Sequence, residues 1–443
     1  MNTDESSIAG EKLVRGLDRW DMTALVINGI IGAGIFGLPS KVYSQIGSYS
    51  LLAFVACAII IGLIVLVYAE VASRFSATGG SYLYAREAFG PAVGFQVGWL
   101  YWIVRISTFA ANCNLLVTYL GFFIPGANEG AMRIAIVSLI VLIITAVNLW
   151  GIRESAAMTN IFTVGKLLPL FVFAVVGMFF LQPGNFTISS VPQYSAFSSA
   201  VMLLIYAFVG FEGAVVLAGE TKKPEKIMPF GLILGVCVVT LVYIAVQIVS
   251  IGTLPGLATS ERPIADAATV FLGPFGAAFI TIGILISIYG NINGAVLTAT
   301  RTLFAMSEQG DLPKVFGKTH PKFKTPYVAI IGTSVVILIF TLQSSFLTAV
   351  AIATITRLIV YATTCLALPI FRRRRGMPAA SFSVPFGVLV SLLSIGLIVW
   401  LLTNVDFAKE GFSSLASAVI GLIVFACFRI FKALRVPRSG GRS

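Results

Sequence analysis

The sequence has few charged residues and almost no cysteine or histidine placed for chemistry. Only 11% of its 443 residues are charged, whereas a soluble protein has roughly 25%. The five cysteines lie within apolar stretches without C-x-x-C spacing, and the single histidine, His320, lies in a basic segment. This composition argues against a zinc site or a disulfide framework, so we expect no metal and no cofactor. No grouping of nucleophile, base and orienting residue is evident, so we do not expect an enzyme.

The chain carries a formal charge of +12 at pH 7, a value that also occurs in nucleic-acid-binding proteins. Its basic residues, however, are scattered singly between apolar segments instead of being gathered in a patch. We therefore expect no nucleic-acid partner. The basic residues are better explained by the orientation of a membrane protein.

Apolar residues make up 58% of the chain, and they form runs of about twenty residues, the length that spans a bilayer. Backbone groups in lipid must be satisfied internally, so each run should be a helix. The sequence thus predicts an all-α integral membrane protein with twelve transmembrane helices, in contact with membrane lipid. The twelve predicted spans cover residues 22–46, 49–73, 91–123, 132–151, 157–181, 195–219, 229–253, 267–304, 327–343, 346–371, 382–404 and 411–431.

Basic residues are distributed unevenly between the two sides of this predicted bundle. With the N-terminus inside, 23 of the 30 Lys and Arg fall on the cytoplasmic side, four fall outside and three lie within spans. An excess of positive charge marks the cytoplasmic side, and an odd number of spans would remove the excess. We therefore expect a multi-pass protein of the inner (plasma) membrane whose terminal segments, 1–21 and 432–443, are both cytoplasmic.

Two predicted spans contain clustered glycines at matching places. Span 1 contains Gly29 to Gly37, and span 6 contains Val209 to Ala214. Glycine weakens a helix and lets its backbone open. Broken helices at corresponding positions of two halves point to a transporter binding site, although glycines also serve close helix packing. These spans open two groups of five, 22–182 and 195–371; since five is odd, the second group is inverted.

A helix that opens in the middle of a membrane suits one kind of ligand. The half-helix that begins there presents free N–H groups and a partial positive charge, which suit a carboxylate. The half-helix that ends there presents free carbonyls, which suit an ammonium group or another cation. A single amino acid zwitterion satisfies both ends.

Several segments resemble signatures of one transporter superfamily. Gly32-Ala33-Gly34-Ile35-Phe36 resembles the G-(S/A)-G-x-F motif of the amino acid–polyamine–organocation (APC) superfamily. Residues 77–91, ATGGSYLYAREAFGP, resemble that superfamily's P-x-G-G-x-Y-x-Y-x-x-x-x-F-G-P signature, with alanine in place of the usual proline at 77. Gly210-Phe211-Glu212 resembles its G-x-E motif, and Ala305 to Pro313 its loop after span 8. The resemblance extends over nearly the whole chain.

This resemblance implies a fold and a mechanism. The fold is a LeuT-type 5+5 inverted repeat with spans 1 and 6 discontinuous, plus two extra helices within 382–431. The mechanism is transport of an amino acid or polyamine by alternating access. By position, the N–H groups of Ala33 and Gly34 would hold the substrate carboxylate. The carbonyls of Ile30, Tyr206 and Val209 would hold its amino group, with Tyr206 as an aromatic gate.

Several predicted spans carry an ionisable residue, which is costly within a membrane and usually functional. Lys166 in span 5 is expected to carry the coupled proton, since burial disfavours the charged form and the resemblance places its ammonium at the open part of span 1. The alternative is a lysine that reaches the cytoplasmic surface. Glu212 is expected to couple gating to protonation or, equally well, to bind the freed backbone. Glu70 is expected to pair with loop arginines instead of binding substrate. Arg357 in span 10 has an acidic partner or the cytoplasmic surface as its alternatives, and we assign it no role.

Arg105 in span 3 falls where relatives line the side-chain pocket. A permanent guanidinium there favours an anionic or extra polar group on the substrate; the alternative is a structural ion pair with Glu212. In span 8, Ser287, Asn291 and Asn293 face either the site or neighbouring helices. The expected substrate-binding residues are Ile30, Gly32, Ala33, Gly34, Arg105, Tyr206, Val209 and Gly210.

The function favoured by these observations is proton-coupled import of an amino acid or a related small amine. An exchanger that swaps an amino acid for a product such as a polyamine remains open on sequence grounds. A sensor that binds without transporting is less well supported, since no cytoplasmic domain is evident to carry a signal. A channel is disfavoured, since broken helices around a midplane site suit alternating access.

Overall fold

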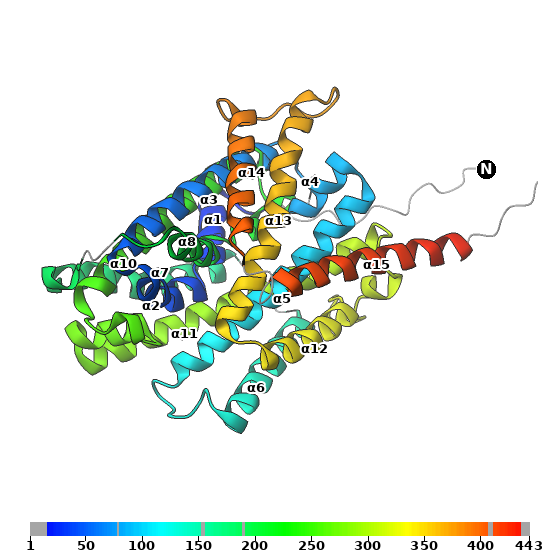
Figure 1. Ribbon diagram of the computed structural model, residues 1–443. Coiled ribbons are helices and arrows are strands. Elements are labelled where there is room, and N and C mark those ends of the chain that lie inside the picture. Colours follow the sequence, from blue (N-terminus) through cyan, green and yellow to red (C-terminus); the bar gives the residue numbers. More distant parts are fainter. Residues whose placement is uncertain (1–15, 78, 152–155, 188–190, 406–410, 436–443) are drawn as a thin grey trace, which may run out of the picture.

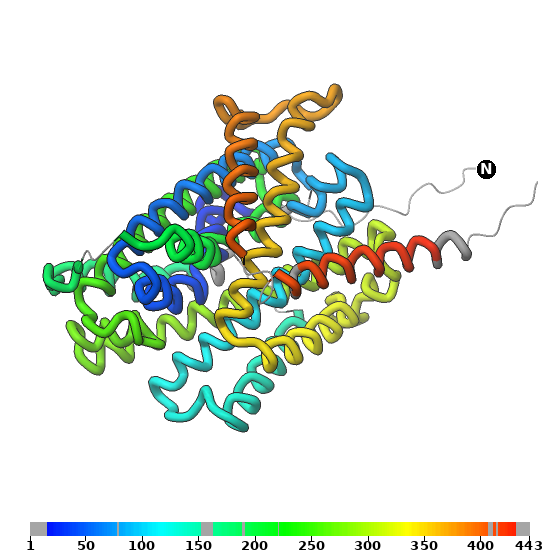
Figure 2. The backbone as a smooth tube through the Cα atoms, viewed as in Figure 1, coloured from blue at the N-terminus to red at the C-terminus, as the bar shows by residue number. Residues whose placement is uncertain are grey.

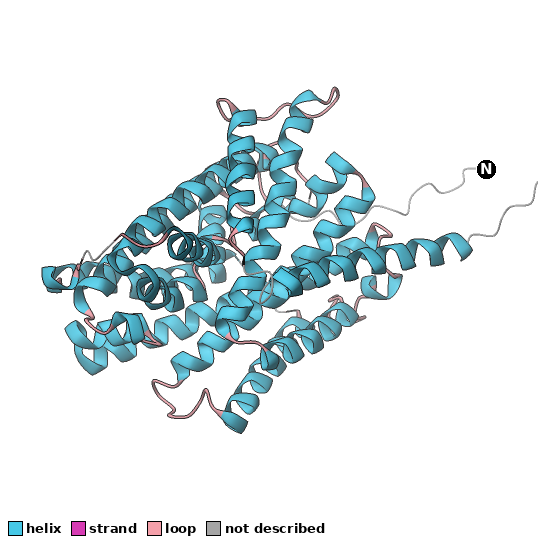
Figure 3. Cartoon of the chain, viewed as in Figure 1, coloured by secondary structure: helices cyan, strands magenta, loops and turns pink. Residues whose placement is uncertain are grey.

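The computed structural model describes residues 16–77, 79–151, 156–187, 191–405 and 411–435. Within these ranges the regular structure is helical (Figure 3), and an isolated β-bridge joins Leu17 to Thr221. Most of the predicted N-terminal segment and the end of the predicted tail lie outside the described residues. The prediction of an all-helical chain is confirmed for the part of the chain that the structure describes.

Each of the twelve predicted spans contains at least one helix. The first span comprises two helices, α1 and α2, and the sixth comprises α8 and the short α9. The helices of the spans, in chain order, are α1 (Arg19–Ile30), α2 (Ala33–Ile46), α3 (Ser50–Ala72), α5 (Pro91–Leu120), α6 (Gly130–Trp150), α7 (Ala156–Gly177), α8 (Tyr194–Phe208), α9 (Glu212–Val215), α10 (Pro224–Thr253), α11 (Pro263–Glu308), α12 (Tyr327–Gln343), α13 (Phe346–Arg373), α14 (Gly387–Thr403) and α15 (Phe412–Arg435).

Seven helical stretches of the described chain are long and apolar enough to cross a membrane, and four shorter apolar helices accompany them. Many large apolar side chains point outward, among them Leu142, Leu241 and Phe275. So much exposed apolar surface is unusual for a soluble protein and fits a surface that faces lipid. These features show that the chain is a multi-pass membrane protein.

One helix was not predicted. Residues 74–90 lie between the predicted spans 49–73 and 91–123, but α4 (Gly80–Phe89) occupies most of them. Gly79 and Gly80 both have positive φ, 144° and 54°, which lets the chain turn sharply before α4. Because α4 carries Arg86 and Glu87, its hydropathy is lower than that of the apolar runs that predicted the other helices.

The helices form one bundle around α5, which packs against both α11 and α13. Helix α1 packs against α10 and α7, and α2 packs against α8, so the two interrupted spans lie together (Figure 2). Helices α13 and α14 form an antiparallel pair, and α15 packs along α5 at the edge of the bundle (Figure 1). This arrangement brings the interruptions of spans 1 and 6 close to the central helices.

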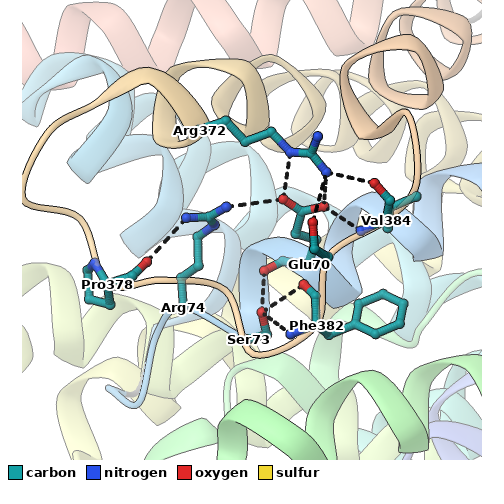
Figure 4. A network of polar contacts seen from close by, with 8 residues as sticks. Glu70, Ser73, Arg74, Arg372, Pro378, Phe382 and Val384 are labelled. Atoms are coloured by element: carbon teal, nitrogen blue, oxygen red, sulfur yellow. Dashed lines mark hydrogen bonds and ion pairs between the residues drawn. The ribbon is translucent and has the colours of Figure 1, made fainter.

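An acidic side chain joins the end of α3 to the connection between α13 and α14 (Figure 4). The Glu70 carboxylate is fully buried and lies 2.6 Å from Arg372 and 3.1 Å from Arg74. It also accepts a hydrogen bond of 2.8 Å from the backbone N–H of Val384. The prediction that Glu70 pairs with arginines is confirmed, and the network holds this end of the bundle together.

Candidate functional site

Both predicted interruptions are present. Helix α1 ends at Ile30, Ile31 and Gly32 are extended, and α2 begins at Ala33. Helix α8 ends at Phe208, and two non-helical residues follow before the turn that opens α9. Each interruption frees backbone N–H and C=O groups that an unbroken helix would have paired. The breaks are narrower than the glycine clusters that predicted them, since most of residues 29–37 is helical.

The two interruptions touch through their backbones. Gly210 has φ +122°, and a Cβ atom added there would lie 2.1 Å from the carbonyl oxygen of Gly29. A Cβ atom at Gly34 would lie 2.4 Å from the Cα of Ala207. Gly34 and Gly210 are therefore required by close backbone approach and, at 210, also by the positive φ. Close helix packing and interruption of the helix were alternative explanations for the clustered glycines, and both occur in this region.

A small cavity lies between the interruptions. Its volume is about 10 Å³, room for about one water molecule, so a larger ligand requires the surrounding side chains to move. All eight residues expected to bind substrate line this cavity, and five others join them. The lining residues are Gly29, Ile30, Gly32, Ala33, Gly34, Arg105, Thr108, Asn112, Tyr206, Val209, Gly210, Asn291 and Arg357.

Asn112 of α5 lies against the N-terminus of α2 and was not among the residues predicted for the site. Its Oδ1 accepts a 3.0 Å hydrogen bond from the N–H of Ala33, the group expected to hold a carboxylate. Its Nδ2 donates to the carbonyl of Thr108 (2.8 Å) and to the hydroxyl of Tyr206 (3.1 Å). The sequence did contain a signal for Asn112, because an amide side chain stands there within an apolar predicted span. A carboxylate can bind at Ala33 only after Asn112 turns away.

The carbonyl groups at the end of α1 also have partners. Asn291 of α11 donates to the Gly29 carbonyl over 3.2 Å, so this side chain does face the site. The Tyr243 hydroxyl of α10 lies 3.3 Å from the carbonyl oxygen of Ile30 and donates to it. These donors show that the freed carbonyls accept hydrogen bonds, as a substrate ammonium group would require.

Lys166 reaches the interruption of span 1. Its side chain is 1% exposed, and its Nζ donates to the carbonyl oxygens of Asn28 (3.1 Å) and Ile31 (3.3 Å). Of the two orientations considered from the sequence, the one toward the open backbone is present, and the side chain does not extend to the membrane surface. A positive charge therefore lies behind the cavity, against the C-terminal end of α1, where carbonyl oxygens favour a cation.

Glu212 joins the interruption of span 6 to helices α5 and α13. Its Oε2 accepts hydrogen bonds from the N–H of Gly210 (2.9 Å) and the hydroxyl of Tyr361 (2.6 Å). Its Oε1 lies 3.0 Å from both Arg105 and Arg357. The expected hydrogen bond to freed backbone and the expected ion pair with Arg105 are both present. Arg105 also lines the cavity, so pairing with Glu212 and facing the substrate are compatible.

Arg357 was assigned no role from the sequence, yet it lines the cavity and is only 2% exposed. It donates to the Thr108 hydroxyl over 3.0 Å in addition to its contact with Glu212. Its position in a predicted span was a signal in itself, since ionisable residues within a membrane are costly and usually functional. The sequence did not reveal its partner, because Glu212 and Thr108 lie far away along the chain.

The site combines polar backbone, amides and fixed charge. It offers donors and acceptors for a small polar molecule, but among the described residues no three His, Cys, Asp or Glu side chains lie together as metal ligands would. Such an arrangement binds and orients a ligand by charge and hydrogen bonds.

Comparison with known proteins gives consistent matches along the chain. The profile of the family described as amino acid permease matches residues 17–441. Three relatives from Bacillus subtilis (strain 168) are similar to the chain. The methylthioribose transporter is 27% identical to this chain, and the match covers 90% of both proteins. The serine/threonine exchanger SteT is 30% identical, and the match covers 84% of this chain and 86% of the exchanger. The branched-chain amino acid permease BcaP is 30% identical, and the match covers 73% of this chain and 74% of the permease.

Proposed function

Because the chain belongs to the amino acid permease family of the APC superfamily, we propose that it is a secondary transporter that moves an amino acid across the plasma membrane by alternating access. The family and the three relatives are transporters and not enzymes. The observation that carries the proposal is the cavity between two helix interruptions, lined by free backbone and by buried charge.

We further propose the LeuT-type arrangement, with residues 22–182 and 195–371 as inverted repeats and 382–431 as two added helices. Helix packing supports it. If span 1 is equivalent to span 6 and span 2 to span 7, the contact of α1 with α10 has its counterpart in the contact of α8 with α3. Span 3 (α5) is then equivalent to span 8 (α11), and span 5 (α7) to span 10 (α13). The contact of α7 with α11 therefore corresponds to the contact of α13 with α5, and the contact of α7 with α1 corresponds to that of α13 with α8. All of these packed pairs occur.

The proposed substrate site is the cavity itself. The amino group would bind at the carbonyls of Ile30, Tyr206 and Val209, and the carboxylate at the N–H groups of Ala33 and Gly34. Displacement of Asn112 from Ala33 would then accompany binding, which ties occupancy to the conformation of α5. We also propose that both termini lie in the cytoplasm, because an excess of basic residues marks that side.

Proton coupling through Lys166 is the proposed source of energy. The ammonium group bridges two carbonyls at the end of α1, so its loss on deprotonation would weaken the contact between α7 and that helix. A positive charge already at this place leaves little reason for sodium to bind there.

The test is uptake in proteoliposomes with and without an inward proton gradient. Native protein should accumulate substrate faster with the gradient, and Lys166→Ala should lose that dependence while still binding substrate. Lys318→Ala, which removes an exposed lysine of the loop after α11, is the matched control and should respond as the native protein does. An unchanged response to the gradient in Lys166→Ala would rule out this residue as the coupling group.

Exchange is the second candidate mechanism, since one relative is named as a serine/threonine exchanger. Counterflow separates the two. An exchanger takes up labelled substrate only when unlabelled substrate is loaded inside the vesicles, whereas a symporter accumulates it into empty vesicles under a proton gradient.

A further inference from the structure

The charges that face the cavity do not balance. Two arginines, Arg105 of α5 and Arg357 of α13, both line it, and both contact a single carboxylate, Glu212. We propose that this site selects an amino acid with an acidic side chain, whose second carboxylate binds between Arg105 and Arg357. The inference rests on the proposed function and adds the chemical class of the substrate to it.

Glu212 has no capacity left to neutralise two cations. Arg105 and Arg357 both contact the same oxygen, Oε1, at 3.0 Å, while Oε2 already accepts hydrogen bonds from Gly210 and Tyr361. The Nε of Arg357 is the atom that contacts Oε1, whereas the Nε of Arg105 is buried and lacks a hydrogen-bond acceptor among the described residues. Buried donors of this kind are costly unless an acceptor reaches them.

In the part of the chain that the structure describes, no other buried carboxylate pairs with these two arginines. Among the described residues, the other two buried carboxylates pair with different arginines: Glu70 with Arg74 and Arg372, and Asp311 with Arg86. The group formed by the two cavity arginines and Glu212 therefore carries a formal charge of +1. Its members are 6%, 2% and 1% exposed, so solvent screens this charge poorly.

Nearby groups increase the positive potential. Helix α2 begins at the cavity, and its N-terminus carries a partial positive charge. The ammonium of Lys166 lies against the carbonyls of Asn28 and Ile31, just behind the interruption. A cationic amino acid or a polyamine would add to this charge, and a zwitterion without a charged side chain would leave it unchanged.

An acidic amino acid carries one net negative charge and brings it to zero. A carboxylate accepts two parallel hydrogen bonds from a guanidinium, a geometry that a neutral amide cannot reproduce with the same strength. Glutamate and glutamine have almost the same shape, so their comparison isolates the charge. The structure also predicts which variant should lose the preference, because Arg357 can be removed while Arg105 keeps Glu212 as its partner.

The experiment measures binding of labelled L-glutamate, L-glutamine, L-leucine and L-arginine to purified full-length protein in nanodiscs. The buffer is chloride-free, at pH 7. We expect glutamate to bind at least about tenfold more tightly than glutamine, the ratio that one charge-assisted hydrogen bond provides. Arg357→Gln should reduce this ratio to near one, and Arg357→Lys should restore part of it. Arg429→Gln, at an exposed arginine of α15, is the matched control and should keep the native ratio.

The outcomes separate this inference from the proposed function. Tight binding of glutamine or leucine with weaker binding of glutamate would overturn the acidic class and leave amino acid transport intact. Neutral substrates that bind tightly only when chloride is added would mean that an inorganic ion supplies the charge, which also overturns it. Binding of none of these four amino acids would overturn the acidic class, and the same measurement on the remaining amino acids would then decide the proposed function. The glutamate-to-glutamine ratio of the native protein decides the matter even if Arg357→Gln fails to fold.

Discussion

The carbonyl oxygen of Gly29 occupies the place where a side chain at Gly210 would begin, only 2.1 Å from a Cβ atom built there. These residues belong to different interrupted spans, far apart in the sequence. Their contact joins the two interruptions back to back, with the cavity beside them. The same contact fixes the shape of the cavity, because neither backbone can move toward the other.

Gly210→Ala should therefore disrupt the site. Alanine at φ +122° is strained by about 1–3 kcal/mol, and its methyl group would overlap the Gly29 backbone, which has no flexible end to give way. We expect a lower melting temperature in detergent and no detectable uptake. Gly294→Ala in α11 is the control, since a Cβ atom there meets no other atom within 4 Å. Equal melting temperatures for the two variants would contradict this account.

Glu212→Gln should be severely destabilising. The change leaves two buried guanidinium groups without a counter-charge, and removal of one partner from a buried ion pair costs about 3–5 kcal/mol. Adding Arg357→Met to Glu212→Gln should recover part of the loss, because it removes one of the uncompensated charges. Thermal unfolding followed by tryptophan fluorescence measures both. Glu261→Gln on the exposed surface is the control, and a Glu212→Gln protein as stable as this control would contradict the prediction.

Glu70→Gln should loosen the connection between α13 and α14 that Figure 4 shows. The amide keeps one acceptor but loses the charge-assisted bonds to Arg372 and weakens the contact with the Val384 N–H. Loss of such buried bonds costs about 1–3 kcal/mol. Hydrogen exchange should become faster in residues 374–386 while the exchange of α5 stays unchanged. Glu129→Gln is the surface control, and the hydrogen-exchange rate of residues 374–386 in this variant should equal that of the native protein. A native exchange rate in Glu70→Gln as well would show that the network is dispensable.

Asp18 should make the start of α1 sensitive to acid. Its carboxylate accepts hydrogen bonds from the N–H groups of Asp21 and Trp20, which lower the pKa of Asp18 below its usual value. A lowered pKa means that the stabilisation is present above the unfolded-state pKa, about 4, and is lost as the pH falls below it.

Asp18→Ala should accordingly lower the melting temperature at pH 7, because loss of an N-cap costs about 1 kcal/mol. The gap from the native protein should narrow at pH 3.5. Asp18→Asn keeps an acceptor that does not titrate, so its effect at pH 7 should be smaller than that of alanine. A gap between native protein and Asp18→Ala that stays constant between pH 7 and pH 3.5 would exclude the charge as the cause.

Local composition was enough to predict the helices and their interruptions. Apolar runs predicted the helical segments from 22–46 to 411–431, since a run of apolar residues has few alternatives to a helix in lipid. Glycine clusters predicted where spans 1 and 6 open, because glycine stabilises a helix poorly wherever it occurs. Local composition did not predict α4, because its charged residues lower its hydropathy. This helix is stabilised by packing against α5 and α13, which local composition does not reveal.

The occupants of the site were predicted only in part. The motif resemblance identified Arg105, Lys166 and Glu212 as residues of interest, but each was left with two interpretations. Asn112 and Arg357 were not assigned to the site at all, although both line the cavity.

The sequence by itself determined that this protein is a bundle of membrane helices with two of them opened by glycine, because those properties depend on residues close together in the chain. Only the tertiary structure decided which side chains meet at the openings. Arg105 and Glu212 are 107 residues apart, and Thr108 and Arg357 are 249 apart. Whether such residues pair depends on how helices rotate and pack against one another, and neither hydropathy nor spacing along one helix contains that information.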